Sequence, residues 1–327
     1  MSNPGIRIHE TGGPERLWLE ELPVPTPARG EVVVRHRAIG VNFLDCYHRS
    51  GLYPLPGLPS GIGSEGAGVV EAVGPGVDRL APGARVAYAG GVAPGSYCLL
   101  RAVPAWRLVP VPDAVNDTTA AAVLLKGLTA EFLVRRLFRV GPGHRALVHA
   151  AAGGVGLLLC QWLRHLGASV FGVVSTRAKA ELAAANGCHH PIVSGEEDFV
   201  AAVRAITKDK GVDVVYDSVG KATIGASMRC CKRRGTLVSY GNSSGAPDPI
   251  APGDLMRAGS LFFTRPSLVD YTATRQELLR AAEVVFDHVA AGVLRAHVHT
   301  VLPLAEAAEA HRRLEARATT GALVLAP

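Results

Sequence analysis

Hydrophobic and polar positions alternate over short distances in the first part of the chain, up to about residue 120. Apolar runs such as those at 31–35, 68–71 and 84–88 are brief, and prolines and glycines interrupt the chain between them. Short apolar runs bounded by turn-forming residues are typical of strands. This part of the chain is therefore predicted to form a β-rich, partly open barrel.

The pattern changes near residue 123, where apolar residues begin to recur at helical spacing. A helix is predicted over 123–138, followed by a turn at 141–143, a strand over 146–149 and an apolar helix over 157–166. Further strands are predicted at 169–174, 191–194, 212–216, 236–240 and 260–264, with helices at 177–185, 197–207 and 224–231. Valine-rich strands that alternate with amphipathic helices indicate a parallel sheet covered on both faces. The middle of the chain is predicted to be a doubly wound α/β domain.

This alternation stops after about residue 265. The remaining segments predict a helix over 274–291, a short strand containing 296–299, a helix over 304–315 and a strand over 322–325. The tail is too short to bury a core of its own, so we expect it to pack back on the N-terminal barrel. The expected domains are 1–124 and, inserted after it, the doubly wound unit 125–265, with 266–327 as a return segment that completes the first domain.

The composition is that of a folded, soluble protein, with 48% hydrophobic and 19% charged residues in 327. No apolar run reaches the roughly 18 residues of a membrane span, and the N-terminal segment lacks the features of a signal peptide. A cytoplasmic location is therefore expected. The six cysteines show no C-x-x-C spacing, which predicts reduced thiols.

The net charge of +6 raises the question of an RNA or membrane partner. The positive residues are scattered, however, and the compact run Lys232–Arg234 is predicted to be a solvated turn between a helix and a strand. A groove for a phosphorylated ligand is another use for such a charge. We expect neither a nucleic-acid nor a membrane partner.

A glycine-rich segment, HAAAGGVG at 149–156, connects a predicted strand to a predicted helix. On the dinucleotide-binding pattern G-x-G-x-x-G it places Ala151, Gly153 and Gly156 at the glycine positions, so its first position departs from the consensus. Such a turn can also connect a strand to a helix without binding a ligand. Because further strand–helix units follow, a Rossmann unit is expected, with a pyrophosphate at the helix N-terminus held by Ala152, Gly153, Gly154, Val155 and Gly156.

The end of the second strand of this unit indicates which dinucleotide binds. A site for NAD normally has an acidic residue there for the ribose 2′-hydroxyl. The segment at 174–179 has no acidic residue but offers Ser175, Thr176, Arg177 and Lys179, which suit a 2′-phosphate. Thr176 also has the position of a helix N-cap, which would explain it without a ligand. The cofactor is therefore predicted to be NADPH.

Several long motifs resemble those of one known family. They are the segments 41–45, 49–54, 149–156, 214–220, 240–245, 264–267 and 316–319. In these segments the chain resembles the zinc-free NADPH:quinone oxidoreductases of the medium-chain dehydrogenase/reductase superfamily, which include relatives of zeta-crystallin. The resemblance implies a GroES-like β-barrel catalytic domain with an inserted Rossmann domain, a cleft between them for the nicotinamide, and a homodimer joined largely through the cofactor domains. Ser194 stands where close relatives carry a tyrosine near the adenosine phosphate.

The metal-binding motifs of zinc-dependent alcohol dehydrogenases are altered in this chain. Asn42 stands in the place of a cysteine ligand, and Ser64 stands in the place of a histidine ligand. With two of three ligands lost, a catalytic zinc site cannot be completed. No metal is therefore expected.

The resemblance implies that Asn42, Tyr47, Tyr53 and Arg265 line the nicotinamide and quinone site. Asn42 would fix the ribose or a substrate oxygen, the tyrosines would offer a flat ring and a phenolic donor, and Arg265 would attract a developing anion. Each also has a structural alternative, as a turn cap, core filler or salt-bridge partner. Asp45 is expected to organise its loop, and no obligatory general acid is visible.

Further residues are expected around the cofactor. By resemblance, Lys126 and Thr129 approach the nicotinamide, while the turn with Ser218 and Val219 covers the ribose and adenine together with the loop of Gly241, Asn242 and Ser243. Arg317 is a further candidate, with a surface helix cation as its alternative.

Three other groups of residues are weaker candidates. Cys188–His190 has no carboxylate partner at the spacing of metal ligands, and His297 and His299 share one face of a predicted strand, which alone does not make a metal site. Cys46 has no neighbouring base and is expected to be a small filler.

The predicted function is NADPH-dependent reduction of a quinone by hydride transfer without a metal. A quinone becomes a hydroquinone anion whose charge is delocalised, so a few hydrogen-bond donors suffice. Two alternatives stay open: an NADPH-dependent enone or 2-alkenal reductase on the same scaffold, and an NADPH-binding, RNA-associated protein with incidental turnover.

Overall fold

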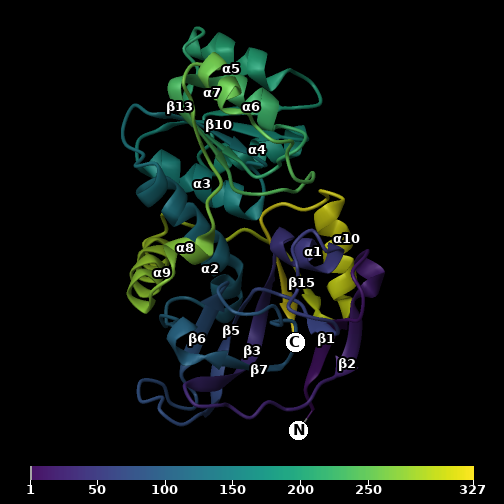
Figure 1. The fold of residues 1–327 in the computed structure, drawn as a ribbon. Coiled ribbons are helices and arrows are strands. Elements are labelled where there is room, and N and C mark those ends of the chain that lie inside the picture. The colour runs from purple at the N-terminus through teal and green to yellow at the C-terminus, as the bar shows by residue number, and fades with distance from the viewer. Residues whose placement is uncertain (1) are drawn as a thin grey trace. The chain divides into compact units, whose positions relative to one another are not determined.

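The computed structural model describes residues 2–327 and divides the chain into two units. Unit 1 comprises the residues up to Leu128 together with Tyr271–Gly292 and Ala296–Pro327. Unit 2 comprises Thr129–Asp270 and Val293–Arg295. Figure 1 traces the chain through both units, and each is described by itself.

Unit 1 is built around a long strand, β3, which pairs with strands from both ends of the chain. Its strands are β1 (Pro4–Ile8), β2 (Trp18–Glu21), β3 (Glu31–Val41), β4 (Ser60–Gly61), β5 (Glu65–Val73), β6 (Arg85–Ala89), β7 (Leu100–Pro104), β8 (Val109–Pro110), β15 (Val298–Pro303) and β16 (Ala322–Ala326). In the described residues, β15, β16, β3, β5, β6 and β8 follow one another in one sheet, with β7 on β3, and β2, β1 and β4 form a second sheet. The antiparallel pairing of β16 with β3 joins the end of the chain to its beginning.

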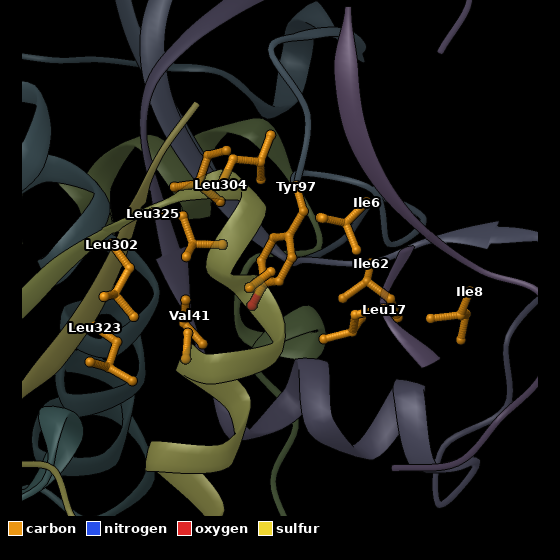
Figure 2. Packing of buried hydrophobic residues seen from close by; sticks show 13 residues of the cluster. Ile6, Ile8, Leu17, Val41, Ile62, Tyr97, Leu302, Leu304, Leu323 and Leu325 are labelled. Carbon is orange, nitrogen blue, oxygen red and sulfur yellow. The ribbon is translucent and has the colours of Figure 1, made fainter. Parts of the chain in front are cut away.

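An apolar core holds these segments of unit 1 together (Figure 2). Ile6 from β1 and Val41 from β3 belong to the same buried cluster as Leu323 and Leu325 from β16. The ring of Tyr97 also lies in this cluster. Because side chains alternate along a strand, Leu323 and Leu325 point to the same face of β16 and are buried in this core together.

The helices of unit 1 include one that the apolar pattern did not predict. They are α1 (Phe43–Ser50), α2 (Asp117–Glu131, which runs on into unit 2), α9 (Arg275–Ala290) and α10 (Ala307–Glu315), with short 3-10 turns at Pro14–Arg16, Ala105–Arg107 and Leu304–Glu306. Helix α1 is only eight residues long and buries the charged residues Asp45 and Arg49, so it is too short for helical spacing to be read from its apolar residues alone.

The helix predicted over 123–138 differs in its bounds. Helix α2 begins at Asp117, because the Asn116 side chain accepts a hydrogen bond from the Thr119 amide (2.8 Å) and caps the first turn. Residues Phe132–Leu137 then form a π-helical turn.

Unit 2 is a doubly wound parallel sheet, as the alternating pattern predicted. Its strands are β9 (Arg145–His149), β10 (Ser169–Val174), β11 (His190–Val193), β12 (Val212–Asp217), β13 (Cys231–Ser239) and β14 (Phe262–Thr264). Its helices are α3 (Gly154–His165), α4 (Arg177–Ala185), α5 (Phe199–Thr207), α6 (Ile224–Cys230), α7 (Pro252–Arg257) and α8 (Leu268–Tyr271, which ends in unit 1). The strand order β11-β10-β9-β12-β13-β14 reverses direction at β9, which is the Rossmann order.

The start of β13 corrects the prediction for the basic run Lys232–Arg234. The strand begins at Cys231 rather than at 236, so these exposed residues lie in its first part and not in a turn. A register shift between Val212 and Val214 of β12 allows this extra pairing, with Val212 opposite Cys231.

The described residues, 2–327, also bear on the expectations for membrane spans and disulfide bonds. No helix within these residues is long and apolar enough to cross a membrane. The six cysteines in this range are buried and free of disulfide bonds.

We predict that Leu325→Ala lowers the free energy of unfolding by about 2–5 kcal/mol, because it removes a buried side chain from the shared core. Urea unfolding followed by tryptophan fluorescence measures this change. Val301→Ala on the neighbouring strand β15 is the control, since Val301 is 47% exposed and its loss should cost no more than about 0.5 kcal/mol. Equal effects of the two substitutions would contradict the role of β16 in the core.

Candidate active site

The glycine-rich turn joins β9 to α3 in unit 2. Ala150 has a left-handed backbone (φ 49°), and its carbonyl accepts a hydrogen bond from the Gly153 amide (2.8 Å). A Cβ atom at Gly156 would lie 2.2 Å from that carbonyl oxygen, so a side chain there would prevent the helix from approaching the strand. The predicted residues Ala152, Gly153, Gly154, Val155 and Gly156 all lie at the start of α3. Amides in the first turn of a helix have no partner within the helix and are suited to hold an anion.

The segment after β10 carries the polar residues predicted for a 2′-phosphate. Ser175, Thr176 and Arg177 are exposed, and Lys179 is half-buried. The Thr176 hydroxyl accepts a hydrogen bond from the Lys179 amide (3.3 Å), so the predicted N-cap of α4 is present. Arg177 Nε lies 2.8 Å from Glu196, and its side chain is 80% exposed. An exposed ion pair of this kind is weak, so the guanidinium can exchange the carboxylate for a phosphate.

Buried Asp217, at the end of β12, shapes the next loop. Its carboxylate accepts hydrogen bonds from the amides of Val219 (2.8 Å) and Gly220 (2.9 Å) and from the hydroxyls of Thr223 (2.7 Å) and Ser227 (2.7 Å). The sequence analysis did not assign this residue. An acidic residue that directly follows a buried strand is the signal that would have found it.

A Ser–His–Asp arrangement accompanies this carboxylate. The Ser227 hydroxyl donates to Asp217 and therefore accepts from Nε2 of His149 (2.9 Å). Burial lowers the pKa of His149, so the ring is neutral. Ser227 is buried and its proton is directed to a carboxylate rather than to a base, which does not fit a nucleophile.

The loops after β12 and β13 are joined to each other. The Ser243 amide donates to the Ser218 carbonyl (3.2 Å), and the Ser244 amide donates to the Val219 carbonyl (2.8 Å). A Cβ at Gly241 would lie 2.6 Å from the Ser218 carbonyl oxygen, so the close approach requires glycine there. Ser218, Val219, Gly241, Asn242 and Ser243 are thus brought together.

These segments share one edge of the unit 2 sheet. Strands β10, β9, β12 and β13 are parallel neighbours, and each predicted segment follows the carboxyl end of one of them. In doubly wound folds, ligands bind at this edge, where the strand order reverses. Thr129, also predicted, is buried near the start of unit 2. Arg265 is exposed just after β14, and its Nη1 donates to the Ser239 carbonyl (3.0 Å).

Unit 1 contains a cluster of three buried polar residues that we call the Asn42 cluster: Asn42, Glu65 and Lys126. Oε1 of Glu65 accepts hydrogen bonds from Asn42 Nδ2 (2.8 Å) and Lys126 Nζ (2.6 Å), and Oε2 accepts from the Leu125 amide (2.9 Å). A Cβ at Gly40 would lie 2.1 Å from the carboxylate, so this glycine makes room for it. The buried carboxylate is compensated by a buried ammonium group.

Glu65 was missed as a site residue in the sequence analysis. Its carboxylate joins two residues that were predicted, Asn42 and Lys126. The acidic residue directly after Ser64 was the available signal. Ser64, in the place of a zinc ligand, donates instead to Asp45 Oδ1 (2.6 Å). Within residues 2–327, no group of three His, Cys, Asp or Glu side chains is arranged to hold a metal ion.

Asp45 organises its loop, as expected. It is the third residue of α1 and accepts a hydrogen bond from the Asn42 amide (2.9 Å) in a capping arrangement. It also accepts from Ser64 and from the hydroxyl of Tyr97 (3.0 Å). Burial raises the pKa of Asp45 to about 6, against the effect of these donors.

The remaining predicted residues of unit 1 lie at two places. The rings of Tyr47 and Tyr53 are neighbours, with centroids 5.2 Å apart. Arg317 is exposed and has a left-handed backbone (φ 55°) just after α10. The weaker candidates have structural partners: Cys46 is buried against His311, and His297 and His299 both contact the Thr320 hydroxyl (3.1 and 3.2 Å).

Comparisons with known proteins agree with this architecture. Residues 28–113 match the model of the alcohol dehydrogenase GroES-like domain, and residues 154–287 match that of the zinc-binding dehydrogenases. Together they correspond to the predicted barrel and Rossmann domains.

Full-length relatives are also similar. The chain is 46% identical to quinone oxidoreductase 1 of Escherichia coli, over 98% of this chain and 99% of the relative. It is 46% identical to the 2-haloacrylate reductase of a Burkholderia species, over 98% of each chain. Among solved structures, E. coli quinone oxidoreductase complexed with NADPH matches with a TM-score of 0.97 and 45% identity, over 99% of this chain and 100% of that one. The chain therefore belongs to the quinone oxidoreductase family of the medium-chain dehydrogenases and reductases.

Proposed function

We propose that this protein transfers a hydride from NADPH to a quinone and needs no metal ion to do so. The observation that carries the proposal is the set of predicted cofactor segments at the carboxyl edge of the unit 2 sheet. It includes a glycine turn that excludes side chains and a β10 end that offers cations. Family membership and the NADPH held by a similar structure support it.

The residues at this edge fit a phosphorylated dinucleotide. The first-turn amides of α3 would hold the pyrophosphate, and Gly156 lets this helix pack closely against the end of β9. Ser175, Arg177 and Lys179 would hold the 2′-phosphate. The two joined loops, with Ser218, Val219, Gly241, Asn242 and Ser243, would line the ribose and adenine. NADPH, when bound, supplies the hydride.

The Asn42 cluster would orient the reactants. Glu65 holds the Asn42 amide by a hydrogen bond, so Asn42 is ready to fix the ribose or a substrate oxygen. Lys126 carries a buried positive charge that would stabilise the negative charge developing on the quinone. We propose that Thr129 and Arg317 border the nicotinamide. Tyr47 and Tyr53 would offer ring faces to the quinone, and Arg265 would attract its anion.

The hydrogen bonds of Asn42 and Ser64, the residues in the places of zinc ligands, support a reaction without a metal ion. Asn42 donates its amide to Glu65, and Ser64 donates its hydroxyl to Asp45, so both groups serve carboxylates. The Glu65 carboxylate is already compensated by Lys126. A hydroquinone anion delocalises its charge, so hydrogen-bond donors suffice in place of a Lewis acid.

Two further properties belong to the proposal. We propose a homodimer joined through unit 2, because β14 lies at the edge of its sheet and Phe262 on it is 64% exposed. We also propose a cytoplasmic location, in line with the free thiols.

An enone or 2-alkenal reductase is the second candidate. It is favoured by the similarity to a 2-haloacrylate reductase, whose substrate name denotes an activated alkene. The same donors would hold the enolate formed when hydride adds to the β-carbon.

Steady-state oxidation of NADPH distinguishes the two activities. We expect kcat/KM for benzoquinone or naphthoquinone to exceed that for a simple 2-alkenal by about 10-fold or more, because the quinone product needs less stabilisation. The reverse order would favour the second candidate. No turnover with either acceptor would contradict both.

Arg177→Ala and Lys179→Ala are each expected to weaken NADPH binding about 10-fold while leaving NADH binding within about 2-fold, because only NADPH carries the 2′-phosphate. Fluorescence titration with both nucleotides measures this. Arg257→Ala is the matched control, since Arg257 is also an exposed cation paired with a neighbouring carboxylate, Asp254. Equal loss of NADPH and NADH, or a preference of the unaltered protein for NADH, would contradict the assignment.

A further inference from the structure

Unit 1 contains a second set of buried polar groups that the proposed function does not use. We call it the polar chain: Asp45, Tyr97, His311, Arg49 and Glu315. The Tyr97 hydroxyl contacts Asp45 Oδ2 (3.0 Å) and His311 Nε2 (3.1 Å). His311 Nδ1 contacts Arg49 Nη1 (3.1 Å), and Arg49 Nη2 lies 2.6 Å from Glu315 Oε1. The first four of these residues are each at most 2% exposed.

Chemistry fixes the direction of every hydrogen bond in the polar chain. A guanidinium only donates, so His311 Nδ1 must accept from Arg49 and the ring proton must be on Nε2. His311 then donates to the oxygen of Tyr97, and Tyr97 donates to Asp45. Burial lowers the pKa of His311 to about 3, which keeps the ring neutral in this tautomer. Asp45 is the final acceptor and is ionised in this arrangement.

The polar chain ends at the Asn42 cluster. Asp45 Oδ2, which accepts from Tyr97, also accepts from the Asn42 amide, and the Asn42 side chain donates to Glu65. Asp45 Oδ1 accepts from Ser64, the residue before Glu65. A single carboxylate therefore fixes the backbone of Asn42 and the segment that carries Glu65.

The other end of the polar chain is on α10, far away in the sequence. His311 and Glu315 both belong to this helix, and Arg317 follows it. In Figure 1, α10 and α1 lie next to each other, in agreement with their contacts. Arg49 on α1 joins them through its contacts with His311 and Glu315. A continuous path of hydrogen bonds therefore links the Asn42 backbone to helix α10.

A purely structural role does not explain so many buried polar groups. The Tyr97 ring lies among apolar side chains (Figure 2), where packing would be satisfied by an apolar residue. Burying a carboxylate is costly unless donors surround it, and apolar replacements of buried ionic groups are often as stable. The same unit also holds a second buried tyrosine–histidine pair, Tyr88 and His36 (2.9 Å), which also forms hydrogen bonds with Arg101 and with the Cys98 carbonyl.

We propose that Asp45 is a positioning residue for the reduction, held by Tyr97 and His311 so that helix α10 sets the geometry of Asn42. This inference rests on the proposed function. Asp45 acts through Asn42 and Ser64, and it does not itself touch the reacting atoms.

The polar chain also implies a pH dependence. The titratable groups that face Asp45 are Cys46 and Arg49 on α1, Glu65 on β5, Tyr97, and His311 on α10. Burial and the nearby Glu65 raise the pKa of Asp45 to about 6, opposed by its donors. Asp45 is therefore ionised above this pH and accepts all of its hydrogen bonds there, whereas protonation below it removes an acceptor. Activity should fall as the pH drops through 6.

The test is a pH profile of quinone reduction for the full-length protein, Asp45→Asn and Tyr97→Phe. We expect kcat at pH 8 to fall about 10-fold or more in each variant, because displacement of an orienting group slows the reaction. KM for NADPH should stay within about 2-fold. Asp45→Asn should also lose the decrease in kcat near pH 6, which a purely structural role would leave in place.

Tyr88→Phe is the matched control, since Tyr88 is buried and bonded to a histidine in the same unit. It should keep its kcat within about 2-fold even if its thermal midpoint falls as much as that of Tyr97→Phe. In a double-mutant cycle, Asp45→Asn and Tyr97→Phe should be non-additive in kcat, whereas Asp45→Asn and Tyr88→Phe should be additive.

The outcomes distinguish a failure of the positioning role of Asp45 from a failure of the proposed function. An active unaltered protein whose kcat and pH profile survive both substitutions overturns the positioning role and leaves the proposed function standing. If Asp45→Asn does not fold, Tyr97→Phe decides by the same criteria, because it retains the ring. An unaltered protein without quinone turnover contradicts the proposed function instead.

Discussion

The buried ion pair of Glu65 and Lys126 is the interaction on which unit 1's part of the proposed site depends. Its atoms are 2.6 Å apart and are shielded from water, so each charge is costly without the other. The same carboxylate holds the Asn42 side chain, and Gly40 leaves the space it needs. A positive charge is thereby fixed beside Asn42 by the protein itself, and in the proposed function it takes the place of a metal ion.

Unit 2 obeys a different constraint, the close approach of backbone to backbone. At Gly156 and Gly241, a Cβ would lie well within van der Waals distance of a carbonyl oxygen. These contacts bring helix α3 and two loops to the carboxyl edge of one sheet, where amides and side-chain donors converge. Asp217 completes the arrangement by binding the amides of the loop after β12. The proposed division of labour follows: unit 2 binds the dinucleotide by its backbone, and unit 1 orients reactants by buried charges.

The alternating pattern of the middle segment predicted the doubly wound sheet, and helix α4 lies at its predicted bounds, 177–185. The local sequence did not predict features that depend on contacts with residues far away along the chain. Helix α1 has only eight residues and buries Asp45 and Arg49 against partners such as Tyr97 and His311 from other segments, so its local sequence did not predict it. Glu65 was missed because its ammonium partner is 61 residues away, and the polar chain because His311 is 214 residues from Tyr97. Residue type indicated the candidates, but only the folded chain connects them.

The central claim is that the buried ammonium and hydrogen-bond donors replace a metal in an NADPH-dependent reductase. A crystal structure of the protein grown with NADPH and zinc, with anomalous data at the zinc absorption edge, tests it most directly. The account predicts NADPH at the carboxyl edge of unit 2, with its 2′-phosphate beside Ser175, Arg177 or Lys179, and no anomalous peak near Asn42, Ser64 or Glu65. A zinc peak bound by Glu65, with Lys126 displaced, would contradict it.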